Sequence, residues 1–124
     1  MTQLSYILLA VDNPAASAET YSRILDAQPV ENSPTFVLYV LPSGLKLGLW
    51  IKTGVEPAPK APGGVEISFS EPDDDAVRAT CAKWRALGLD IVQEPTQMDF
   101  GFPFVAADRD GHRLRVFALS ADPS

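Results

Sequence analysis

The chain has 124 residues and a formal net charge of −6, with 46% hydrophobic and 21% charged residues. This length suits one domain, or two small halves that cannot each hold a separate core. The acidic balance and the scattered Lys and Arg residues argue against a nucleic-acid partner, which requires clustered basic residues. A single cysteine, Cys81, excludes an intrachain disulfide.

The N-terminal segment MTQLSYILLAVDN has no basic region, and its apolar run extends only from Tyr6 to Val11. This run is too short for a signal peptide or a membrane span. We therefore expect a cytoplasmic protein with no membrane partner.

The first half of the chain has the pattern of a strand, a helix and three more strands. An apolar run over residues 5–11 predicts the first strand. Asn13 followed by Pro14 predicts the start of a helix, because proline at the first helical position lacks the N–H that would otherwise be unpaired. Further strands are expected over residues 29–33, 35–41 and 45–52, and Pro42-Ser43-Gly44 makes the last two a hairpin.

Residues 53–64, TGVEPAPKAPGG, are rich in proline and glycine and predict a linker. The same pattern then repeats, with a strand over residues 65–70, a helix that starts after Pro72 and stops at Gly88, and three strands over residues 90–94, 101–107 and 113–119. We predict one α+β domain over residues 1–124, made of two βαβββ modules (1–53 and 65–124). The modules are expected to form one curved mixed sheet with helices on its convex side.

Period-two alternation divides the residues of each strand between two faces. The face away from the helices is expected to collect aromatic and a few polar side chains: Tyr6, Leu8, Gly48, Trp50, Glu66, Ser68, Arg113, Arg115 and Phe117. Phe100, Phe102 and Phe104 also recur at period two and are expected to lead into the same cleft. The pattern leaves open which face of residues 35–41 lines it.

A concave sheet face of this composition has the character of a small-molecule cavity. Gly48 is expected to leave open space beside the Trp50 indole. The alternative is that this face packs on another subunit, and both interpretations hold if the cavity lies at a dimer interface.

In this order and spacing, the paired βαβββ pattern, the stretch VDNPAASAETYSRILDAQPV and the ending DRDGHRLRVF resemble the vicinal oxygen chelate superfamily. That superfamily includes glyoxalase I, ring-cleaving dioxygenases and bleomycin-binding proteins. The ending is similar to the family's D-P-D-G-N-x-x-E strand, with Arg109 in place of the proline.

The resemblance implies that enzymatic members hold a divalent metal at positions that match Tyr6, Gly48, Glu66 and Arg115. Of these only Glu66 is a suitable ligand, because tyrosine is a poor neutral ligand, glycine has no side chain and arginine stays cationic. We therefore expect no metal, no other cofactor and no catalytic residue. Glu66 and Arg115 are expected to form an ion pair in the cleft, and the alternative for Arg115 is a contact with a ligand carboxylate. His112, at a hairpin tip, is not expected to be a metal ligand.

Within the superfamily the sequence is most similar to the metal-free drug-binding branch, of the phenazine and bleomycin resistance type. This implies a homodimer that sequesters a planar aromatic compound such as a phenazine- or quinoxaline-like antibiotic, and the sequence leaves open whether halves are exchanged between the chains. Trp50 would stack on the ligand, with further contacts from these residues: Tyr6, Leu8, Gly48, Ser68, Phe100, Phe102, Phe104 and Arg115. Two alternatives stay open: a metal-dependent enzyme of the glyoxalase or dioxygenase type, and an interaction protein with a vestigial cleft in which Trp50 is an interface or core residue.

Overall fold

The computed structural model describes residues 2–120, and the chain divides into two compact units between Ala61 and Pro62. Each unit has the element order strand, helix and three strands. The predicted α+β fold of two βαβββ modules is therefore confirmed. Neither helix has the length and apolarity to cross a membrane within the residues that the structure describes.

The first unit holds one helix and a four-stranded sheet in the order β1-β4-β3-β2, in which β1 and β4 are parallel and the other neighbours antiparallel. Its elements are β1 (Tyr6–Val11), α1 (Pro14–Leu25), β2 (Glu31–Asn32), β3 (Phe36–Val40), β4 (Lys46–Ile51) and a 3-10 turn (Lys52–Gly54). The strand expected over residues 29–33 is thus only two residues long, at the edge of the sheet.

Local capping and a buried tyrosine set the position of α1. The Asn13 side chain accepts a hydrogen bond from the Ala16 N–H at 3.2 Å, as a helix N-cap residue does. The fully buried Tyr39 donates its hydroxyl hydrogen to the Ala18 carbonyl at 3.1 Å, with Ser22 Oγ at 2.7 Å. Tyr39 therefore faces the helix, and Phe36, at odd spacing from it, lies on the opposite face of β3.

The second unit repeats this arrangement with the strand order β5-β8-β7-β6, in which β5 and β8 are parallel. Its elements are β5 (Glu66–Ser70), α2 (Asp74–Ala86), β6 (Asp90–Gln93), β7 (Gly101–Ala107) and β8 (Arg113–Leu119). Trp84 of α2 lies between Phe69 and Phe104, with ring centroids 5.4 Å away in both cases and near-perpendicular planes. These edge-to-face contacts attach the helix to the sheet.

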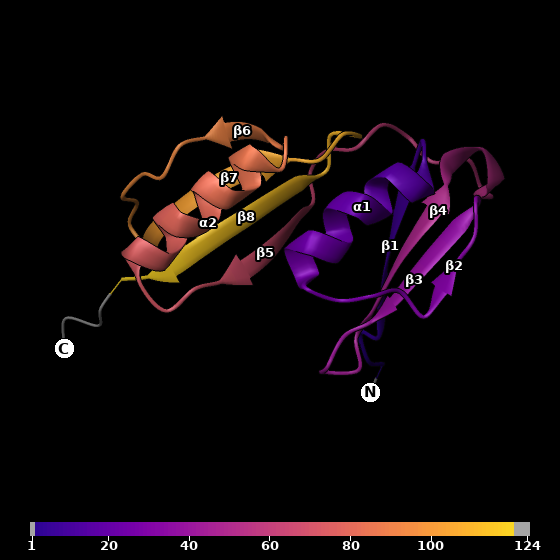
Figure 1. Ribbon diagram of the computed structural model, residues 1–124, viewed down its shortest axis with the longest axis horizontal. Helices are drawn as coiled ribbons and strands as arrows, with labels where there is room; N and C mark the ends of the chain where they lie inside the picture. The colour runs from indigo at the N-terminus through magenta and orange to yellow at the C-terminus, as the bar shows by residue number, and fades with distance from the viewer. Residues whose placement is uncertain (1, 121–124) are drawn as a thin grey trace. The chain divides into compact units, whose positions relative to one another are not determined.

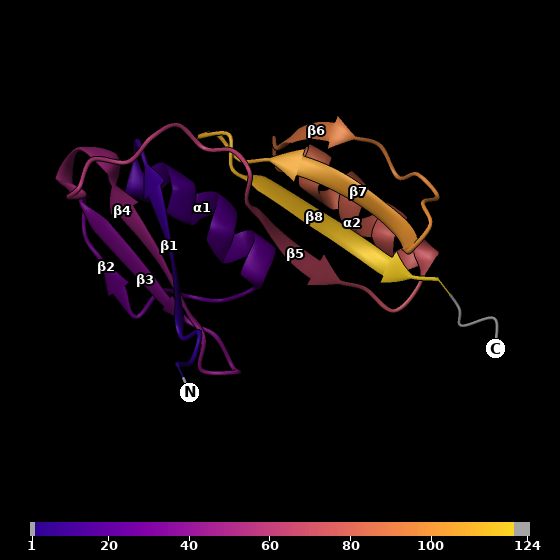
Figure 2. The same cartoon turned by 180° about the vertical axis from the view of Figure 1, so that it is seen from behind.

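In each unit the helix covers one face of the sheet, as the two opposite views show (Figures 1 and 2). The other face, called here the open face of that unit, carries the side chains that alternate with the core. The described strands form two four-stranded sheets, one per unit, and not the continuous sheet that we expected. This is because every ladder of backbone hydrogen bonds between the described strands stays within one unit.

The α2 N-cap offers a test of how the second unit is stabilised. Asp73 accepts a hydrogen bond from the Ala76 N–H at 2.8 Å. Asp73→Ala should lower the free energy of unfolding by about 1 kcal/mol, because the N–H loses its acceptor. The measurement is urea denaturation followed by Trp84 fluorescence in a Trp50→Phe background.

Asp74→Ala is the matched control, since it removes an equal charge from the same helical turn. An equal loss of stability in both variants would show that charge, and not the capping hydrogen bond, is what matters at Asp73.

Candidate functional site

The open face of the first unit contains an apolar pocket of about 530 Å³ lined by Tyr6, Leu8, Phe36 and Trp50. Three neighbouring strands supply these side chains. Phe36 of β3 is directly opposite Trp50 of β4, so the two side chains lie on the same face. Tyr6 and Leu8 come from the adjacent β1. We refer to this site as the apolar pocket.

Gly48 allows the side chains of β1 to lie across β4. A Cβ atom at Gly48 would be 2.5 Å from Tyr6 Oη and 3.0 Å from Leu8 Cδ1. The expected open space at Gly48 beside Trp50 is therefore occupied by Tyr6 and Leu8, which form a wall of the pocket. Gly48 shapes the pocket because any side chain at this position would require Tyr6 and Leu8 to shift.

Tyr6 is the polar group of this pocket. Burial, with the nearby Glu31 carboxylate as a smaller cause, raises the pKa of Tyr6 above its ordinary value. The phenol therefore stays neutral at physiological pH and can both donate and accept a hydrogen bond. Tyr6 and Leu8 are still 38% and 40% exposed, so an apolar surface is open to a binding partner.

The open face of the second unit carries a charged cluster of Glu66, Arg113 and Arg115. Arg115 donates two hydrogen bonds to the Glu66 carboxylate, from Nε to Oε1 at 2.8 Å and from Nη2 to Oε2 at 3.1 Å. Arg113 Nη2 lies 3.3 Å from Glu66 Oε2. The hydrogen bonds from Arg115 lower the pKa of Glu66, with both arginine charges as additional causes, so the carboxylate stays ionised.

Aromatic residues of the second unit are divided between the two faces of its sheet. Phe100 and Phe117 contact each other on the open face, with ring centroids 6.4 Å apart. Phe102 and Phe104 instead pair with Ala118 and Val116 on the helix face, and both are buried. The prediction that Phe102 and Phe104 line the cleft is therefore wrong, because β7 is an inner strand whose aromatic side chains fill the core under α2.

The residues at the family's metal positions do not form a metal site. In the first unit, Gly48 has no ligand atom and is covered by the neutral Tyr6. In the second unit, Arg115 is a cation and occupies both oxygens of Glu66. A divalent ion at Glu66 would have to displace two guanidinium groups, so this donor set does not fit the family's metal.

One further group of possible ligands, Asp108, Asp110 and His112, lies within 4.8 Å in the β7–β8 turn. The Asp108 carboxylate accepts hydrogen bonds from the backbone N–H groups of Asp110 and His112, both at 2.9 Å. Its second oxygen is 2.9 Å from His112 Nδ1, and this hydrogen bond raises the pKa of the imidazole. These contacts give the cluster a role in forming the turn that leads into β8.

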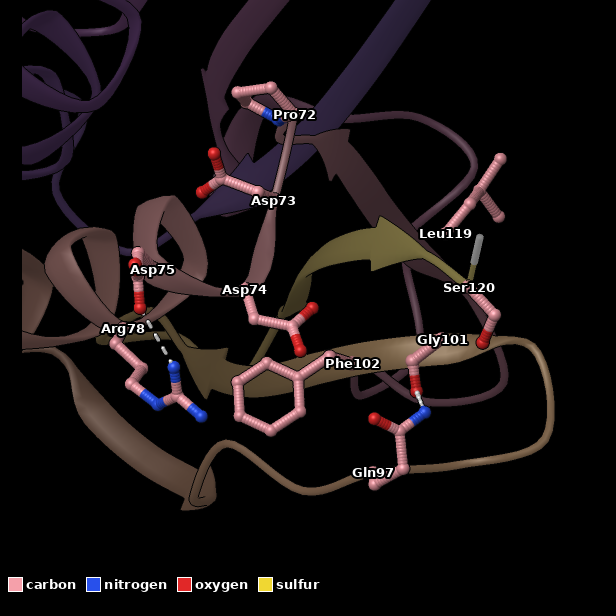
Figure 3. Close-up of a pocket in the computed structure, with 10 residues that line it drawn as sticks. All are labelled: Pro72, Asp73, Asp74, Asp75, Arg78, Gln97, Gly101, Phe102, Leu119 and Ser120. Carbon is pink, nitrogen blue, oxygen red and sulfur yellow. Dashed lines mark hydrogen bonds and ion pairs between the residues drawn. The ribbon is translucent and has the colours of Figure 1, made fainter. Parts of the chain in front are cut away.

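A second hollow lies beside the start of α2 (Figure 3), and its lining includes Asp73, Asp74, Asp75, Arg78, Gln97 and Phe102. Arg78 pairs with Asp75 at 3.0 Å, and its guanidinium lies 4.7 Å from the centre of the Phe102 ring. Asp73 caps the helix. Gln97 Nε2 donates to the backbone carbonyls of Met98 and Gly101. These contacts are local to the helix start and the β6–β7 connection.

The sequence model of the Glyoxalase/Bleomycin resistance protein/Dioxygenase superfamily matches residues 3–116. The chain therefore belongs to this superfamily.

Three relatives show how far the similarity extends. The phenazine antibiotic resistance protein EhpR of Enterobacter agglomerans is 28% identical over 115 residues, which cover 90% of this chain and 88% of EhpR. Protein ATC0852 of Agrobacterium tumefaciens, whose structure was solved by NMR, is 47% identical to this chain. The two structures superpose with a TM-score of 0.90 over 98% of this chain and 100% of the ATC0852 chain. A glyoxalase-related enzyme from Fulvimarina pelagi is 22% identical, has a TM-score of 0.86 over 95% of this chain and 88% of its own, and shows the shared fold.

Phe36 is the pocket residue that sequence reasoning missed. Residues 36 and 50 each lie seven positions from Ser43, the centre of the predicted turn. Directly opposite residues of a hairpin share a face. Counting outward from the turn would therefore have placed Phe36 beside Trp50, as the strand register does.

The Glu66–Arg115 pair predicts a characteristic pH dependence. Because the folded-state pKa of Glu66 is lowered, the pair stabilises the fold above the carboxyl's unfolded pKa, roughly 4.3. This stabilisation is lost as pH falls through the lower, folded-state value. Glu66→Gln should therefore be less stable than wild type at neutral pH, with a difference that shrinks in acid, as measured by urea denaturation at a series of pH values.

Asp99→Asn, which changes an exposed carboxylate in the β6–β7 connection, is the control and should show little difference at any pH. A Glu66→Gln deficit that is constant from neutral pH to acid would contradict an ionised, arginine-bound Glu66.

Proposed function

We propose that this protein binds a planar, mostly apolar aromatic compound and confers resistance by sequestering it without chemical change. The apolar pocket is the observation that carries the proposal, because three aromatic side chains and one leucine surround a hollow open to solvent. The similarity to EhpR, a phenazine antibiotic resistance protein, supports the same role.

The pocket suits a flat ring system in both size and chemistry. Its volume of about 530 Å³ lies within the range of small-molecule sites, roughly 300–1,000 Å³. Trp50 and Phe36 provide ring faces on which a ligand can stack, a contact that contributes on the order of 1 kcal/mol per aromatic pair beyond area burial. The neutral Tyr6 hydroxyl supplies one hydrogen bond to a ring nitrogen or oxygen.

Tryptophan fluorescence tests this proposal directly, since Trp50 lines the pocket while Trp84 is 3% exposed in the core of the second unit. Phenazine or quinoxaline should quench the wild-type emission in a saturable way. Trp50→Ala should abolish this quenching and weaken binding about tenfold or more, because the stacking surface is lost.

Trp84→Phe is the matched control and should retain saturable quenching. Quenching that survives Trp50→Ala but disappears in Trp84→Phe would place the ligand elsewhere. Metal analysis of the purified protein addresses the rival enzymatic function, and a stoichiometric, tightly bound divalent ion would overturn the proposal.

The proposal includes a homodimer in the cytoplasm. The open face of the first unit exposes apolar side chains on two of its strands, with Tyr6 38%, Leu8 40% and Val40 44% exposed, and such a surface is of the kind that a second subunit covers. Sedimentation equilibrium should give twice the chain mass of 13.4 kDa. A monomer at micromolar concentration would exclude a pocket shared between subunits.

A further inference from the structure

The charged cluster on the open face of the second unit has more positive than negative charge. Two guanidinium groups, those of Arg113 and Arg115, share the single carboxylate of Glu66. The local charge of the three side chains is therefore +1. Since partly buried charges are stabilised by pairing, the cluster can accept one more anionic group.

Arg113 has fewer contacts with Glu66 and is more exposed than Arg115. Arg115 is 20% exposed and is held by two hydrogen bonds to Glu66. Arg113 is 46% exposed, and its one ion pair among the described residues is the 3.3 Å contact with Glu66. A guanidinium has five N–H donors, so most of those of Arg113 are available to a ligand.

The surroundings of Arg113 form a site with room for an anion. A hollow of about 450 Å³ is lined by Gly64, Val65, Glu66, Ser68 and Arg113. Ser68 is paired with Arg115 across β5 and β8. The Ser68 hydroxyl makes no side-chain hydrogen bond within residues 2–120, so it too can donate to an incoming oxygen.

An aromatic surface continues directly from this cationic group. Phe117 follows Arg115 by two residues on the same face of β8, a separation of about 6.6 Å, and contacts the 43% exposed Phe100. The other acid aligned with this face is Asp90 of β6, which pairs with Ala107 of β7 and lies two strands away from Arg113. Ser68 on β5 is therefore the neighbouring hydroxyl, and Phe117 follows Arg115, four residues along β8 from Arg113.

We infer that Arg113, Arg115 and Ser68 form a carboxylate-binding subsite, with Glu66 orienting the arginines, and that the ligands of this protein are aromatic carboxylic acids. That the ligand contains an aromatic ring rests on the function proposed above. The carboxylate accepts hydrogen bonds from Arg113 and Ser68. Arg113, whose role the sequence left undecided, is the principal determinant of specificity.

The test compares two ligands of the same shape, phenazine-1-carboxylate and phenazine-1-carboxamide, by isothermal titration calorimetry. The acid should bind about tenfold more tightly than the amide to the wild type, because charge-assisted hydrogen bonds replace neutral ones. Arg113→Gln should remove this preference, because it weakens binding of the acid more than binding of the amide. Lys83→Gln, which removes an exposed positive charge from α2 on the helix face, is the matched control and should keep the preference.

Equal affinity of the wild type for acid and amide, or a preference that persists in both Arg113→Gln and Arg115→Gln, would overturn the inference. A second measurement separates it from the proposed function. The arginine Nε–H resonances of the labelled protein are titrated with 2-naphthoate and with 2-naphthamide. If the arginine resonances shift with naphthoate only and phenazine does not quench Trp50, the subsite is retained and the proposed function is rejected. If the resonance of neither arginine shifts, the subsite is rejected.

Discussion

The packing of one helix against one face of a four-stranded sheet is the constraint on which the other features of this protein depend. In each unit a single helix buries alternate strand residues. In the first unit Tyr39 is hydrogen-bonded to α1, and in the second Trp84 of α2 packs between two phenylalanines. The remaining residues of the same strands must face away from the helix. The open face of the first unit carries the apolar pocket, and that of the second unit carries the charged cluster.

In the second unit, the residues that the family resemblance matches to metal ligands form an ion-paired cluster. A carboxylate that would ligate an ion is instead held by two guanidinium groups, which satisfy its charge and lower its pKa. The exchange leaves a cationic surface in place of an electrophilic ion. Such a surface can recognise an anion by hydrogen bonding, but it does not polarise a substrate as a divalent ion does. The donor set at Glu66 and Arg115 therefore does not fit a divalent ion, and its charge suits an anionic group.

Most of the fold could be predicted because local signals agree with tertiary packing. Asn13 and Asp73 cap the two helices through their side chains, and apolar alternation in β4 and β8 correctly assigns the helix face. The assignment failed at β7, where residues on both faces are buried and the period-two pattern has no polar phase to distinguish them. Phe102 and Phe104 were placed on the wrong face for that reason.

The sequence by itself determined the two βαβββ modules, the position of Trp50 on the open face and the charge types at Glu66, Arg113 and Arg115, because these follow from residue identity and alternation along one strand. Only the tertiary structure decided that Tyr6 and Leu8 lie across Gly48, that Phe36 joins Trp50, and that both arginines reach one carboxylate. Each of these contacts joins residues of different strands. Their distances depend on strand register and side-chain conformation, which the pattern along a single strand does not encode.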